Sequence, residues 1–164
     1  GCYTMITTRL TRLAILTALA CVLRIAFGAF PNVKPITALF FVLILAYGLA
    51  DAIIVSTLTM IVTGFLMGFS VIILGQIISY VLILSLGAMI FRWLKSIILR
   101  TLLIFILTML YGFLISIFSA QLFGSPFWPF WISGLTFDLA HAVSTALFFP
   151  ILMTIFKNIL KTRC

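Results

Sequence analysis

Charge is scarce in this sequence of 164 residues. Only 7% of the residues are charged, and the two acidic ones are Asp51 and Asp138. A soluble domain carries roughly 25% charged residues, so this chain cannot cover itself with a water-facing surface. Hydrophobic residues make up 65% of the sequence, and its mean hydropathy is +1.43. The scarcity of charge excludes a soluble globular fold and indicates a polytopic membrane protein.

The sequence also lacks the motifs with which a chain powers its own chemistry. Its three cysteines, Cys2, Cys21 and Cys164, are scattered and predict neither a metal site nor a disulfide framework. It has no Walker A motif and no other Gly-rich phosphate loop, which excludes ATP hydrolysis. Ion-coupled carriers usually bury several carboxylates, but only Asp138 lies within a predicted span. We expect no cofactor or metal, and any uphill transport needs energy from other subunits.

Six apolar segments predict membrane-spanning helices, which need roughly 17 to 25 residues each. They cover residues 10–30, 35–49, 52–66, 71–91, 97–118 and 130–156. The predicted fold class is all-α: one six-helix transmembrane domain over residues 5–164, because residues 1–4, ahead of Met5, look like a tag remnant. The segment 124–129, with two prolines and a tryptophan, predicts a rigid aromatic loop. Around Asp51, the second and third segments could instead form one bent re-entrant unit.

The basic residues predict the orientation of the chain. Eight of the ten lie at the ends of apolar segments, namely Arg9, Arg12, Arg92, Lys95, Arg100, Lys157, Lys161 and Arg163. Basic groups that flank spans face the cytoplasm, so both termini are expected there, in a multi-pass protein of a bacterial cell membrane. The net charge of +8 is thus interpreted as a membrane-orientation signal, and no nucleic-acid partner is expected.

A few polar side chains inside the spans need a partner or a function. A charge at mid-bilayer costs at least about 2.5 kcal/mol on insertion scales. A rise of about 1.5 Å per residue places Arg24 and Asp138 at similar heights in the outer half of the membrane. Asp138 and His141 share one helix face with Trp131, and Gln76 and Tyr80 reach the same zone. We expect an outward-open polar bowl whose substrate-binding residues are Arg24, Asn32, Lys34, Thr37, Gln76, Tyr80, Trp128, Trp131, Asp138 and His141.

Several roles for these residues stay open. Arg24 and Asp138 could form a structural ion pair between the first and last helices, or could orient a ligand at the floor of the bowl. His141 could be a packing residue or a ligand contact. An intramembrane enzyme could use Asp138 and His141 as an acid/base pair, although no nucleophile, metal or second acid is evident nearby. A channel would need polar residues along the full depth of one helix, and here they stop near the middle.

Two stretches of the sequence resemble a known family. They are Pro31–Ala38, with the sequence PNVKPITA, and Gly134–Ala142, with the sequence GLTFDLAHA. Together with six short spans and the Ala14-xxx-Ala18 stripe, they are similar to S components of energy-coupling factor (ECF) transporters, in a group associated with cobalamin. The sequence departs from that group at Lys34, where Gln is more common, and at Ser144-Thr145, where Gly-Asn is more common.

The resemblance implies a function and partners. An S component of these ABC-type importers captures a vitamin outside the cell, joins a membrane coupling subunit that carries two ATPases, and topples to release the vitamin inside. Cobalamin is the expected ligand, with pantothenate, folate or riboflavin as alternatives, and ATP is used by the partner subunits. Ala14 and Ala18 would match the surface that docks the coupling subunit, and the loop from Pro31 to Thr37 would match a lid over the ligand.

Overall fold

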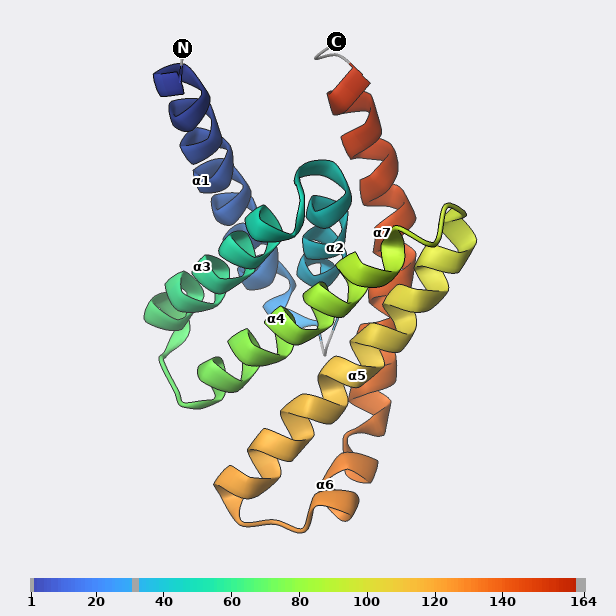
Figure 1. Ribbon diagram of the computed structural model, residues 1–164. Helices are drawn as coiled ribbons and strands as arrows, with labels where there is room; N and C mark the ends of the chain where they lie inside the picture. The colour runs from blue at the N-terminus through green and yellow to red at the C-terminus, as the bar shows by residue number, and fades with distance from the viewer. Residues whose placement is uncertain (1, 31–32, 162–164) are drawn as a thin grey trace.

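The fold was analysed in a computed structural model, which describes the backbone of residues 2–30 and 33–161 and the side chains of residues 5–30 and 33–158. Every regular element in these ranges is a helix (Figure 1). The elements are α1 (Cys2–Ala26), a short 3-10 helix η1 (Phe27–Ala29), α2 (Pro35–Tyr47), α3 (Leu49–Met67), α4 (Ile72–Phe91), α5 (Ile97–Phe123), α6 (Phe127–Ser133) and α7 (Leu135–Lys161). The predicted all-α class is confirmed.

Five helices are long and apolar enough to cross a membrane: α1, α3, α4, α5 and α7. Many large apolar side chains on their outer faces are exposed, as on α3, where Ile54, Leu58 and Val62 follow one another at helical spacing. In water such a surface would be unfavourable, whereas lipid tails match it. The chain is therefore a multi-pass membrane protein, and the sixth span and the cytoplasmic position of the termini stay predictions.

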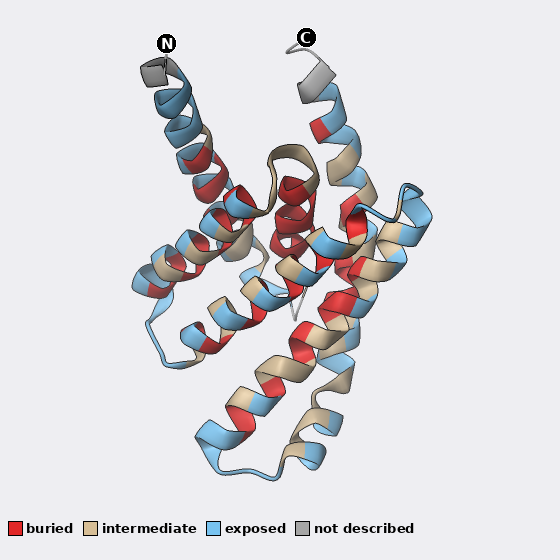
Figure 2. Cartoon of the chain, in the orientation of Figure 1, coloured by how far each residue is buried: buried red, intermediate tan, exposed pale blue. Residues whose placement is uncertain are grey.

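Helix α2 forms the centre of the bundle rather than an ordinary span. Its 13 residues extend over roughly 20 Å, which is less than the roughly 30 Å of a hydrocarbon core. Residues 35–44 are all buried, and Figure 2 shows α2 as a continuous buried segment. It packs against α1, α3, α4, α5 and α7. A helix that is apolar on all sides belongs in such a position.

Gly48 separates α2 from α3. Its φ of +102° lies in a region that only glycine adopts at low cost, and its amide closes the last turn of α2 by donating to the Ile44 carbonyl at 2.9 Å. The chain breaks there into two helices, residues 35–47 and 49–67. Asp51 consequently lies in the first turn of α3, where it pairs with Arg9 and Arg12 of α1.

The last predicted span differs from the structure. A continuous helix was expected from residue 130, but the chain breaks at Gly134 into α6 and α7. The Gly134 amide donates to the Trp131 carbonyl at 3.1 Å, a tightened turn, and Pro129 within α6 removes one backbone donor. Two other helices extend beyond their predicted ends: α1 begins at Cys2, within the proposed tag remnant, and α5 continues to Phe123.

Candidate substrate-binding site

Thr37 lies at the centre of a hydrogen-bonded cluster inside the bundle. Its hydroxyl is 2.8 Å from the Tyr80 hydroxyl and 2.8 Å from His141 Nε2. All three side chains are buried, and they come from α2, α4 and α7. Buried polar groups are costly unless they are paired, so these bonds explain why α2 can carry a threonine in its fully buried first turn.

Tyr111 of α5 completes this cluster. Its ring stacks on Tyr80 with 4.4 Å between centroids and contacts the edge of His141 at 5.5 Å. Sequence reasoning did not include Tyr111 among the site residues. The signal that could have found it is the stripe of small and polar residues Thr108, Gly112 and Ser116 beside it on the inner face of α5.

Arg24 joins the cluster from α1. Its guanidinium donates to Thr63 Oγ1 at 2.5 Å, to Met60 Sδ at 3.1 Å and, through its other terminal nitrogen, to Gln76 Oε1 at 3.4 Å. All these acceptors are uncharged. We call the set Arg24, Thr37, Gln76, Tyr80, Tyr111 and His141 the polar centre.

The ion pair proposed between Arg24 and Asp138 is not formed. The salt bridges within the described residues join Arg9 and Arg12 to the carboxylate of Asp51. The reason is the packing of the helices. α1 packs chiefly on α3, whereas α7 packs on α2 and α5. Arg24 therefore faces α3 and α4 and not α7.

Asp138 lies between α7 and α5. Its carboxyl group contacts Gly112 so closely that a Cβ at that position would overlap it. Its Oδ2 atom is buried and has no hydrogen-bond partner, and the same holds for Nε1 of Trp131, which packs on Phe113. Asp138 is also not bonded to His141, whose Nε2 is occupied by Thr37. An acid/base pair of these two residues is thus not assembled.

Lys34 is close enough to Arg24 and Asp138 for both charges to act on its amino group. Burial lowers the pKa of its amino group to about 8, the charge of Arg24 adds to this lowering, and the charge of Asp138 opposes it. Its backbone amide donates to Ser144 Oγ at 3.4 Å. The two places at which the sequence departs from the cobalamin group, residue 34 and residue 144, are therefore in contact with each other.

The predicted bowl is closed in this structure. Thr37, Tyr80 and His141 are between 0% and 3% exposed, because they satisfy one another's hydrogen bonds. Of the remaining predicted residues, Trp131 lies on α6, Trp128 lies on the outside of α6, and Asn32 lies outside the described residues. Ala14 and Ala18 are exposed on α1, as a docking surface requires.

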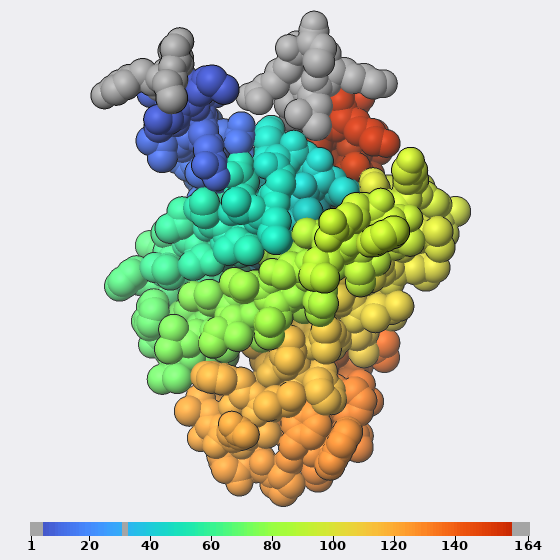
Figure 3. All heavy atoms as spheres, in the orientation of Figure 1, coloured from blue at the N-terminus to red at the C-terminus, as the bar shows by residue number. Residues whose placement is uncertain are grey.

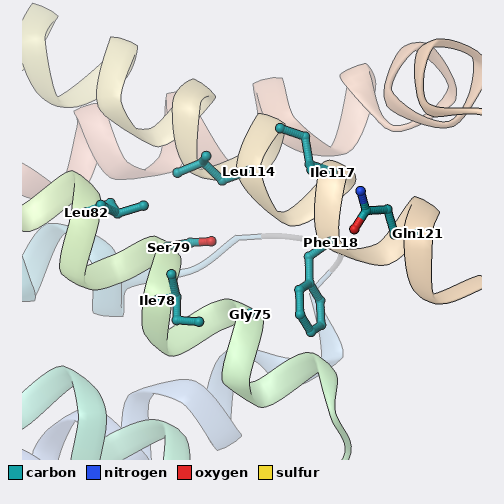
Figure 4. A pocket seen from close by; sticks show the side chains of 8 residues that line it. All are labelled: Gly75, Ile78, Ser79, Leu82, Leu114, Ile117, Phe118 and Gln121. Carbon is teal, nitrogen blue, oxygen red and sulfur yellow. The ribbon is translucent and has the colours of Figure 1, made fainter.

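The cavities of the structure lie away from the polar centre. Figure 4 shows one of about 180 Å³ between α4 and α5, in which Phe118 of α5 reaches across to the α4 backbone at Gly75. A Cβ atom at position 75, in place of the glycine, would overlap the Phe118 ring. A larger cavity of about 650 Å³ lies between α1, α2 and α7. Neither is lined by a predicted substrate-binding residue.

The fold and this centre define a class: a helical membrane protein with a polar interior. No protein-family model, curated protein or solved structure matches the chain. The similarity to ECF S components therefore depends on the residues quoted in the sequence analysis.

Proposed function

We propose that this chain is the substrate-binding S component of an ECF-type vitamin importer in a bacterial cell membrane. It captures a vitamin from outside and delivers it inward together with a membrane coupling subunit and two ATPase subunits. Cobalamin is the favoured ligand, and pantothenate, folate and riboflavin are alternatives within the same function.

The observation that carries this proposal is the lack of charge compensation inside the bundle. Arg24 donates only to uncharged acceptors, and Asp138 Oδ2 has no hydrogen-bond partner. Ionic groups within a membrane protein are costly and are normally paired or functional. A polar ligand that accepts from Arg24 and Lys34 and donates to Asp138 would compensate all three groups. The site is therefore better suited to a bound ligand than to a purely structural role.

The lid expected at residues 31–37 offers a route to the closed centre. Thr37, the last residue of this lid, is hydrogen-bonded to both the Tyr80 hydroxyl and His141 Nε2. Moving Thr37 away would free these two groups for a ligand. Each hydrogen bond contributes only about 1 kcal/mol net, so ligand binding can offset the loss of both.

The partner subunits follow from what the chain lacks. It has no phosphate-binding motif, so ATP must be hydrolysed elsewhere. The Ala14-xxx-Ala18 stripe is exposed on α1, and small residues at this spacing let a second helix approach closely. This stripe is the proposed contact with the coupling subunit.

Co-purification tests the coupling part of the proposal. The tagged chain, extracted from its native membrane in mild detergent, is expected to retain a coupling subunit and ATPases. Ala14→Leu and Ala18→Leu should remove these partners by blocking close approach. Ala26→Leu is the matched control because Ala26 is also exposed on α1, and it should retain them. Wild-type protein that retains no ATPase under these conditions would rule out an S component.

A further inference from the structure

The largest of the described cavities is a groove between the ends of α1 and α7. It measures about 650 Å³, and its apolar walls come from α1 and α7, with Tyr47 of α2 between them. Figure 3 shows the ends of α1 and α7 standing apart at the end of the molecule that carries both termini. The apolar lining is made by Ile15, Leu16, Leu19, Leu23, Leu152, Ile155 and Phe156. We call this cavity the terminal groove.

The terminal groove changes from apolar to polar toward the chain ends. Its outer rim is made by Thr7, Thr8, Thr11 and Arg12. A second hollow of about 290 Å³ adjoins this rim: it shares Thr8 and Arg12 with the groove and adds Met5 and Arg9. The two hollows together form an amphipathic site, with a long apolar part in the bundle and a short basic part at its end.

The basic part of this site carries an excess of positive charge. Arg9 and Arg12 share one carboxylate, Asp51, with N–O distances of 2.7 and 2.5 Å. The only other acidic residue in the chain is Asp138, which lies between α7 and α5. The Arg9 side chain is 50% exposed and that of Arg12 is 22% exposed, and the buried Nε of Arg12 has no hydrogen-bond partner. Because a guanidinium has five N–H donors, both arginines retain donors for a further anion.

We propose that the terminal groove and the adjoining hollow bind one anionic phospholipid from the membrane leaflet nearest the chain ends. An acyl chain lies along Ile15, Leu19 and Phe156, and the phosphate lies in the hollow beside Arg9 and Arg12. Basic pockets between membrane helices are suited to anionic headgroups, and the net positive charge here selects an anionic over a zwitterionic lipid. This inference does not depend on the proposed vitamin function.

The apolar part of the lipid site and the proposed docking stripe lie on different faces of α1. Ala14 and Ala18 each precede a groove residue, Ile15 and Leu19, by one position, which turns them about 100° away at 3.6 residues per turn, whereas Thr7 and Thr11 at the rim share the face of the stripe. An acyl chain in the apolar part of the groove can therefore remain bound while another helix contacts Ala14 and Ala18. The two surfaces can be tested independently.

Native mass spectrometry of the detergent-purified full chain tests this proposal. Phosphatidylglycerol and phosphatidylcholine with the same acyl chains are added in equal amounts. We expect phosphatidylglycerol to remain bound several-fold more often than phosphatidylcholine. Arg9→Gln should reduce this preference, while Arg12 keeps Asp51 paired. Ile15→Trp, which fills the groove and leaves the ion pairs intact, should reduce the binding of both lipids.

Matched controls decide between this site and general surface effects. Arg92→Gln removes a basic group that is also exposed, on the connection after α4, and Ile106→Trp enlarges an equally exposed apolar residue on α5. Both should bind lipid as the wild type does. The proposal is overturned if the two lipids bind equally, if Ile15→Trp has no effect, or if the controls lose as much binding as the test variants. It is also overturned if Ile15→Trp dissociates a dimer, since a second copy would then occupy the groove.

Discussion

The two carboxylates of this protein have opposite surroundings. Asp51, 3% exposed at the start of α3, accepts from Arg9 at 2.7 and 3.0 Å and from Arg12 at 2.5 Å. Asp138, between α7 and α5, has a buried oxygen atom with no hydrogen-bond partner. In a chain with 7% charged residues, Asp51 is paired with two arginines, whereas Asp138 is paired with none.

This difference distinguishes a carboxylate with a structural role, that of Asp51, from the charges of Arg24 and Asp138, which have no ionic partner within the chain. The cluster of Arg9, Arg12 and Asp51 ties α1 to α3, and Arg12 is further held over the Tyr47 ring at 4.2 Å. The carboxylate of Asp51 is thus compensated within the chain, although Arg9 and Arg12 keep further N–H donors. The polar centre leaves Arg24 with uncharged acceptors only. Where a membrane protein retains such groups without compensating them, a ligand or a conformational change is the expected reason.

The largest effect is expected from removing the charge of Asp51. Asp51→Asn leaves two arginines without a counter-charge, and breaking a buried pair in this way costs about 3 kcal/mol. For a chain of this size the apparent melting temperature in detergent should fall by roughly 6 to 12 °C. Asp138→Asn is the matched control and should change the melting temperature little, because Oδ2 of Asp138 has no bond to lose. Equal shifts in the two variants would contradict the comparison.

A smaller effect is expected from closing the space beside Asp138. Gly112→Ala places a methyl group inside the Asp138 carboxyl group, so α5 and α7 must separate, at a cost of about 1 to 3 kcal/mol. Gly28→Ala is the control, because nothing lies within 4 Å of a Cβ there. Thermal unfolding of both variants checks the prediction. A Gly112→Ala protein as stable as the control would show that the two helices are not in close contact at Asp138.

Within the polar centre, the loss of one hydroxyl should have a modest effect. Tyr80→Phe removes the bond to Thr37, which keeps its bond to His141, so the expected loss of stability is about 1 kcal/mol. Tyr47→Phe serves as the control on α2 and should be neutral. If Tyr80→Phe is also neutral in thermal unfolding, Tyr80 does not bond Thr37 in the membrane-extracted protein.

The smallest effect is expected from pH. Because the pKa of Lys34 is lowered to about 8, its amino group is cationic below that pH and neutral above it. Binding of a vitamin that accepts from Lys34 should therefore weaken roughly threefold, a change below 1 kcal/mol, between about pH 7 and about pH 9. Lys34→Gln should bind with no such dependence over this range. A vitamin affinity that stays constant or increases from pH 7 to pH 9 in the wild type would contradict this role.

Helix positions and the members of the polar centre could largely be predicted from the sequence. The lengths of the apolar segments predicted the helices α1, α3, α4, α5 and α7. The energetic cost of polar groups within a membrane singled out Arg24, Gln76, Tyr80 and His141. Thr37 entered through the resemblance and lies in the middle of the cluster. These predictions succeed because each depends on local spacing or on the chemistry of a single residue.

The partners of the ionic groups could not be predicted in the same way. Counting residues along a helix gives the height of Arg24 and Asp138 in the membrane, but not the order in which the helices pack around α2. That order directs Arg24 toward Thr63 and leaves Asp138 beside Gly112. It also brings Arg9 and Arg12 to Asp51, a cluster that sequence reasoning interpreted only as flanking charge. The closure of the bowl likewise depends on packing among four helices.

Equilibrium binding of a radiolabelled vitamin panel to the purified protein tests the central claim most directly. We predict that one vitamin, cobalamin first, binds with a Kd below micromolar, and that Asp138→Asn weakens this binding while leaving the fold stable. If no vitamin in the panel binds below micromolar, or if wild type and Asp138→Asn bind equally well, the uncompensated charges of the interior do not form a vitamin site.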